Sequence, residues 1–133
     1  MIAAPPQSPA GKISVMVVED QPQILKNQLK ILKAFPEIDV IATALSGEAA
    51  LELLEERQPD VILQDLGLPR MTGIEVTRAV KGDPELRAIP ILILSALKSD
   101  KEMEELRRLG AEAFASKPYD GKALTAQIRE LLA

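Results

Sequence analysis

Hydrophobic residues follow two alternating patterns along the chain. Short runs in which almost every residue is apolar are typical of strands that are buried on both faces of a parallel sheet. Such runs occur at residues 13–18, 40–42, 61–63, 91–94 and 113–115. The run at 40–42 is the weakest. The run at 113–115 is short, so its assignment as a strand depends mostly on its context in the chain. Together the runs predict five strands.

Between these runs, apolar residues recur three and four positions apart, which is the spacing of an amphipathic helix. Helix starts are predicted from proline, aspartate and capping hydroxyls, and helix ends from glycine and proline. The starts fall near Pro22, Ser46, Thr72, Ser99 and Asp120, and the ends near Pro36, Pro59, Gly82 and Gly110. Glu75 and Glu102 complete two capping boxes. In the last helix, Leu124, Ile128, Leu131 and Leu132 are predicted to form the apolar face.

Strand and helix therefore alternate five times, which predicts an α/β fold with three layers, a parallel sheet between two layers of helices. A chain of 133 residues is most economically one domain. We assign residues 12–133 to that domain. Residues 1–11 are rich in proline and small side chains and lack the apolar core of a signal peptide, so we expect a flexible tail.

The composition narrows the chemistry. The chain contains no Cys and no His, which excludes disulfides, thiol nucleophiles and imidazole bases and is compatible with a reducing cytoplasm. A net charge of −4 and the lack of a long basic run argue against direct binding to nucleic acid. No apolar stretch approaches the length that spans a bilayer, so we expect a cytoplasmic protein without membrane contact.

Side chains capable of chemistry follow four of the five predicted strands. Glu19 and Asp20 follow the first strand, Asp65 the third, Ser95 the fourth and Lys117 the fifth. Because the carboxyl ends of parallel strands share one edge of the sheet, we expect these side chains to meet there. Clustered carboxylates repel one another, so either one of them takes a proton or a cation joins them. Of the possible cations, Mg²⁺ suits carboxylates and water better than Ca²⁺ or Zn²⁺. With a lysine and a hydroxyl beside it, the set predicts a site for a phosphoryl group.

The same residues resemble a known family. Four features are similar in order and spacing to the receiver domain of two-component response regulators. They are the acidic pair, the Asp-x-x-Leu-Pro-x-x-x-Gly run from Asp65 to Gly73, Ser95, and the Lys117-Pro118 step. The likeness covers about residues 12–132. It implies a flavodoxin-like, doubly wound sheet with strand order 2-1-3-4-5 and five helices.

The resemblance also implies a role for each residue of the site. Asp65 would accept a phosphoryl group from a phosphohistidine in a sensor histidine kinase or phosphotransfer protein, or from a small phosphodonor. Mg²⁺ would be held by Asp20, Asp65 and the backbone carbonyl of Gly67, with Glu19 reaching it through water. Lys117 would help the metal to neutralise the phosphoryl charge.

A switch would follow from phosphorylation. Ser95, where the family often has Thr, would move to the new phosphoryl group, and Phe114, where Tyr is frequent, would turn into the space released. The surface of the fourth helix, fifth strand and fifth helix would change. We expect a regulatory domain, not an enzyme, that controls a downstream protein, an output domain if the chain is excised from a longer one, or its own dimerisation.

Other interpretations fit the residues singly. Asp65 and the Glu19-Asp20 pair are compatible with helix capping and with the helix dipole, and Phe114 with a plain core position. A hydrolase of the haloacid dehalogenase type needs a second aspartate where Gly67 stands. A flavodoxin-like nucleotide binder needs a phosphate loop after the first strand, where Asp20-Gln21-Pro22 stands. A degenerate receiver that only binds partners would not need the complete site.

Overall fold

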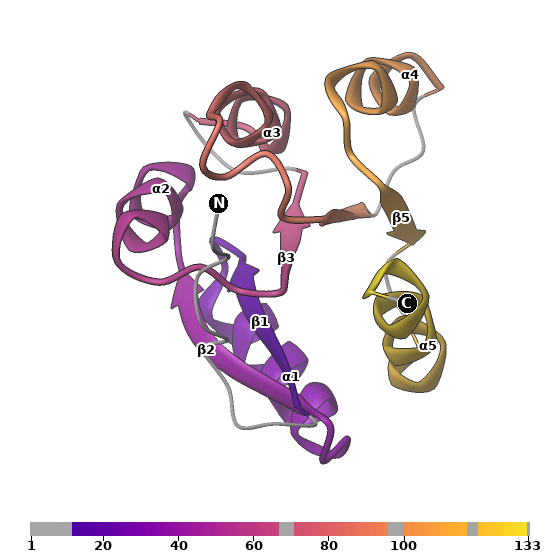
Figure 1. The fold of residues 1–133 in the computed structure, drawn as a ribbon. Helices are drawn as coiled ribbons and strands as arrows, with labels where there is room; N and C mark the ends of the chain where they lie inside the picture. Colours follow the sequence, from indigo (N-terminus) through magenta and orange to yellow (C-terminus); the bar gives the residue numbers. More distant parts are fainter. Residues whose placement is uncertain (1–11, 67–70, 96–99, 117–119, 133) are drawn as a thin grey trace.

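Five parallel strands form one sheet in the order β2-β1-β3-β4-β5 (Figure 1). The computed structural model describes residues 12–66, 71–95, 100–116 and 120–132. The strands are β1 (Ile13–Val18), β2 (Ile38–Ala44), β3 (Val61–Asp65), β4 (Ile91–Ser95) and β5 (Ala113–Ser116). This topology confirms the predicted doubly wound sheet, with β1 and β3 at its centre.

Helices cover both faces of the sheet (Figure 1). They are α1 (Pro22–Lys33), α2 (Gly47–Glu56), α3 (Gly73–Gly82), α4 (Asp100–Leu109) and α5 (Gly121–Leu132). Two apolar clusters divide the core. One joins the sheet to α2, α3 and α4, and the other joins it to α1 and α5. The predicted three-layer architecture is therefore confirmed.

β2 and β3 are both longer than the apolar runs that predict them. β2 runs over Ile38–Ala44 rather than 40–42, because this edge strand pairs only with β1 and tolerates polar residues such as Asp39 and Thr43. β3 extends two residues beyond the apolar run, through Gln64 to Asp65. Asp65 is thus the last residue of a strand whose five positions are all buried.

The capping signals set several helix ends. The Ser46 hydroxyl accepts a hydrogen bond from the Ala49 amide at 3.1 Å, and the Thr72 hydroxyl accepts one from the Glu75 amide at 3.3 Å. Gly110 has a φ of 114° directly after α4, a conformation that favours glycine. Ser99, the predicted cap of α4, lies outside the described residues.

The predicted apolar face of α5 is wrong in one position. Leu124 and Ile128 are buried, but Leu132 is 37% exposed because it lies in the last turn, beyond the edge of the core. Conversely, the polar residues Gln28 of α1 and Thr125 of α5 are buried, and their side-chain polar atoms have no hydrogen-bond partner in the described part of the chain.

A lysine joins three segments at the end of the sheet opposite to Asp65. The Lys81 ammonium, in a side chain that is only 10% exposed, donates to the Arg87 and Ile89 carbonyls at 3.0 and 2.9 Å and to Glu112 at 2.7 Å. The other oxygen of Glu112 accepts a hydrogen bond from the Ile91 amide at 3.0 Å. The contact therefore fixes the starts of β4 and β5 against α3.

Among the residues described, no helix has both the length and the apolar character needed to cross a membrane. The predicted tail, residues 1–11, lies outside the described residues.

Candidate functional site

Three carboxylates meet at the carboxyl edge of the sheet. Glu19 and Asp20 follow β1, and Asp65 ends the neighbouring strand β3. One carboxylate oxygen from each of the three lies within 4.8 Å of the other two. Glu19 and Asp65 are only 1% and 6% exposed, whereas Asp20 is partly exposed. The convergence follows from the parallel sheet, in which adjacent strands end side by side.

Backbone contacts hold the two acidic strand ends. The Glu19 amide donates to the Ala44 carbonyl at 3.0 Å, and one Glu19 carboxylate oxygen accepts from the Gln21 amide at 3.3 Å. After β3, the Leu66 amide donates to the Leu94 carbonyl at 3.1 Å. The acidic side chains therefore project from strand ends that are fixed by backbone hydrogen bonds.

A glycine lets the chain return closely against the end of β3. The Gly73 amide donates to the Leu66 carbonyl at 3.2 Å. A Cβ atom at Gly73 would lie 2.8 Å from the Asp65 carbonyl oxygen and 2.9 Å from the Leu66 Cα, which is closer than real Cβ contacts come. Glycine is thus required at this position by the close approach of α3 to the site.

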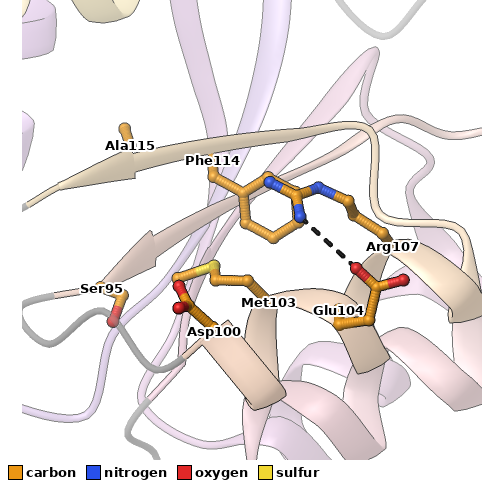
Figure 2. Close-up of a pocket in the computed structure, with 7 residues that line it drawn as sticks. All are labelled: Ser95, Asp100, Met103, Glu104, Arg107, Phe114 and Ala115. Carbon is orange, nitrogen blue, oxygen red and sulfur yellow. Dashed lines mark ion pairs between the residues drawn. The ribbon is translucent and has the colours of Figure 1, made fainter.

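Ser95 ends β4, next to Asp65 in the sheet order, and is buried. It lines a cavity of about 470 Å³ between α4 and β5 (Figure 2). The cavity is lined by Ser95, Asp100, Met103, Glu104, Arg107, Phe114 and Ala115. A continuous space therefore links the hydroxyl at the end of β4 with the aromatic ring on β5.

Arg107 covers the Phe114 ring on the cavity wall. The guanidinium carbon lies 5.1 Å from the ring centroid, a cation–π distance, and Arg107 also pairs with Glu104 at 3.8 Å (Figure 2). Phe114 is partly buried and packs against the core cluster on this face. Periodicity places Arg107 on an exposed helix face, and only the rotation of α4 relative to β5 reveals that it meets the ring.

Two residues predicted for the site, Gly67 and Lys117, lie outside the described residues. The donor set that is described consists of carboxylate oxygens only, which is the ligand type preferred by hard cations such as Mg²⁺. The three oxygens lie within 4.8 Å of one another, so one ion could be shared among them. These residues therefore fit the metal that the sequence predicts.

Comparison with protein families matches residues 15–129 to the response regulator receiver domain. The chain belongs to the response regulator receiver domain family. The receiver domain is 41% identical over 105 residues to the polar-differentiation response regulator DivK of Brucella ovis. The aligned residues cover 79% of this chain and 84% of the relative. The resemblance found in the sequence is confirmed.

Solved structures agree with this family. The receiver domain is similar to the chemotaxis protein CheY4 of Vibrio cholerae, with a TM-score of 0.80 and 29% identity over 91% of this chain and 99% of the other. It is also similar to the signal receiver domain of a signal transduction histidine kinase from Syntrophus aciditrophicus, with a TM-score of 0.80, 28% identity and coverages of 90% and 89%.

Membership places the protein in phosphorylation-dependent signalling. Receiver domains are regulatory domains, they typically use Mg²⁺, and they interact with histidine kinases and output partners. The acidic cluster lies at the carboxyl edge of the sheet, which is where ligands bind in open α/β sheets.

Proposed function

We propose that this receiver domain is switched by transfer of a phosphoryl group to Asp65 in the presence of Mg²⁺. The observation that carries the proposal is the meeting of the Glu19, Asp20 and Asp65 oxygens within 4.8 Å at one sheet edge. Three acidic groups so close together repel one another unless a cation joins them. When bound, the same cation would neutralise part of the charge of an incoming phosphoryl group, which Asp65 accepts.

In this proposal Mg²⁺ is held by Asp20, Asp65 and the backbone carbonyl of Gly67, with Glu19 reaching it through water. When bound, the ion supplies charge neutralisation between the anionic nucleophile and the anionic phosphoryl group. Burial of Asp65 supports the role of nucleophile, since a mostly dry carboxylate loses little hydration when it reacts.

The transfer forms one bond and breaks one. A carboxylate oxygen of Asp65 forms an O–P bond while the N–P bond of a phosphohistidine breaks, and the imidazole nitrogen leaves with the electron pair. With acetyl phosphate, an O–P bond breaks instead and acetate leaves. Lys117 adds a positive charge toward the phosphoryl oxygens.

The phosphoryl group is read through Ser95 and Phe114 in this proposal. Ser95 hydrogen-bonds the new phosphoryl oxygen, and Phe114 turns into the space on the cavity side. The cavity that joins the two residues supports this coupling. Since Arg107 lies over the ring, a movement of Phe114 alters the surface of α4, β5 and α5.

The output partner binds to that surface of α4, β5 and α5. The phosphodonor is a sensor histidine kinase or a phosphotransfer protein in the cytoplasm. The partner that reads the switch is a downstream protein, an output domain in a longer chain, or a second copy of the receiver domain, with no direct contact to nucleic acid.

The experiment is phosphorylation by fresh acetyl phosphate with and without Mg²⁺, followed by intact-protein mass spectrometry. We expect one added phosphoryl group with Mg²⁺, none with a chelator, and none in Asp65→Asn. The matched control is Glu52→Gln, which neutralises an exposed carboxylate on α2 and should be phosphorylated like the wild type. An unmodified wild type, or sustained hydrolysis of a phosphomonoester, would contradict the proposal.

Assembly is tested separately with beryllofluoride, a mimic of the phosphoryl group. We expect Mg²⁺ and beryllofluoride to change amide exchange in α4 and β5, and light scattering then reports whether a second copy binds. Identical exchange with and without the mimic would contradict the proposed output surface.

A further inference from the structure

Gln64 is a polar residue in an otherwise apolar row across the sheet. The strand register places it between Val18 of β1 and Ile93 of β4, and continues the row to Phe114 of β5. Val18 and Ile93 belong to the core cluster beneath α2, α3 and α4. The Gln64 side chain is 0% exposed. An apolar residue would be expected at such a position, so the amide group needs an explanation.

Only one half of this amide makes a hydrogen bond. Nε2 donates to the backbone carbonyl of Asp65 at 2.9 Å. Oε1 is buried and accepts no hydrogen bond within the described residues. An unpaired buried carbonyl oxygen destabilises the folded state. A methionine or leucine here would remove the unpaired oxygen but also the hydrogen bond to the Asp65 carbonyl. The two effects offset each other, so stability alone does not explain the glutamine.

The hydrogen bond that Gln64 does make acts at the end of β3. The carbonyl that it engages belongs to Asp65, the last residue of the strand. Gly73 also approaches so closely that a Cβ atom would lie 2.8 Å from the same oxygen. The Asp65 carbonyl is thus close both to the amide donor of Gln64 and to the start of α3. Asp65 joins the acidic cluster from this fixed peptide.

We propose that Gln64 is a positioning residue for Asp65: its amide fixes the Asp65 peptide so that the carboxylate points at the metal and the incoming phosphorus. This inference rests on the proposed function. Gln64 does not touch the phosphoryl group in this account. Its effect is on the geometry of the nucleophile, to which transfer rates are sensitive.

Gln28 provides a matched control. It is also a buried glutamine, and neither of its amide atoms has a hydrogen-bond partner in the part of the chain that is described. It lies on α1, whose other buried residues, Leu25 and Leu32, belong to the opposite core cluster. Replacing it removes the same chemical group from a similar environment without touching the acidic edge.

The experiment compares Gln64→Met and Gln64→Leu with Gln28→Met in three measurements: phosphorylation by acetyl phosphate, thermal unfolding, and amide exchange at Leu66 and Gly73. Both Gln64 variants should have an unchanged or higher unfolding midpoint. Their maximal phosphorylation rate at saturating Mg²⁺ should fall roughly fivefold, the equivalent of one neutral hydrogen bond. The two amides should exchange faster. Gln28→Met should raise the midpoint and leave the rate and both amides unchanged.

Two results would overturn the inference. A phosphorylation rate within twofold of the wild type, with unchanged exchange at Leu66 and Gly73, would show that the hydrogen bond positions nothing. A lower midpoint in both Gln64 variants would show a structural role instead. If the wild type itself accepts no phosphoryl group, the proposed function fails, and exchange at the two amides still decides whether Gln64 holds the strand end.

Discussion

Replacing Asp20 by asparagine tests the acidic cluster without altering Asp65. The Asp20 side chain is the most exposed of the three carboxylates, so its replacement disturbs packing least. The substitution keeps the shape and removes one negative charge. Because oxygens of all three carboxylates lie within 4.8 Å of one another, two of the three repulsive pairs disappear. Without a metal, Asp20→Asn should therefore be more stable than the wild type.

The magnitude follows from the separation. Two unit charges 4.8 Å apart repel by about 0.9 kcal/mol in water and by about 3.5 kcal/mol at an effective dielectric constant of 20. Because Asp20 is partly exposed, the value in water applies. Removing the two repulsive pairs should therefore raise the free energy of unfolding by about 1–2 kcal/mol. A chain of 133 residues has an unfolding entropy of about 0.28 kcal/mol/K. The midpoint should rise by about 4–7 °C.

Magnesium should cancel most of this difference. At ten times its dissociation constant, a ligand that binds only the folded state contributes about 1.4 kcal/mol, which is about 5 °C for this chain. Asp20→Asn should lose most of that shift. Thermal unfolding in EDTA and in MgCl₂ at equal ionic strength measures both effects. Glu52→Gln changes the net charge equally at an exposed position of α2 and should have the same midpoint as the wild type in both buffers. Equal Mg²⁺ shifts in wild type and Asp20→Asn would refute the reasoning.

Three further predictions concern other residues. Lys81→Met removes an ammonium that donates to two backbone carbonyls and one carboxylate. It should lower the free energy of unfolding by about 3 kcal/mol and the thermal midpoint by about 10 °C. A midpoint that falls by less than about 3 °C would contradict this. Gly73→Ala should slow phosphorylation at least about tenfold by displacing the Asp65 peptide, and a normal rate would show that the close approach is dispensable. The ion pair with Arg129, chiefly through its hydrogen bond, lowers the pKa of Glu37 below the ordinary 4.5. The stabilisation by this ion pair is therefore present above pH 4.5 and is lost as the pH falls through the lower folded-state pKa of Glu37. The thermal unfolding midpoint of Arg129→Gln should therefore lie below that of the wild type at pH 7, and the two midpoints should converge in acid. A difference in midpoint that persists at pH 2 would contradict this.

The central strands could be predicted from the sequence because burial on both faces leaves an uninterrupted apolar run. Residues Val15 to Val17 and Ile91 to Leu94 have no exposed surface at all. The edge strand β2 was predicted too short, since one side of an edge strand meets water and Asp39 and Thr43 interrupt the apolar pattern. The strand order does not follow from periodicity, which carries no information on which strands are neighbours. It came from the family resemblance.

The acidic cluster could also be predicted, because strand ends of a parallel sheet share an edge regardless of the distance between them in sequence. The contact of Arg107 with Phe114 could not, since it depends on the rotation of α4 about its axis. The Gln64 hydrogen bond was equally hidden, because it depends on a side-chain rotamer. Gln28 is buried in the middle of α1 and Leu132 is exposed in the last turn of α5, so the hydrophobicity of a residue does not by itself decide its burial.

The most direct measurement is a crystal structure of the receiver domain grown with Mg²⁺ and beryllofluoride. We predict that beryllium is bonded to a carboxylate oxygen of Asp65 and that Mg²⁺ lies against Asp20 and Asp65. Ser95 should contact a fluoride. A mimic bound elsewhere, or a metal bound away from Glu19, Asp20 and Asp65, would contradict the proposed phosphorylation of Asp65.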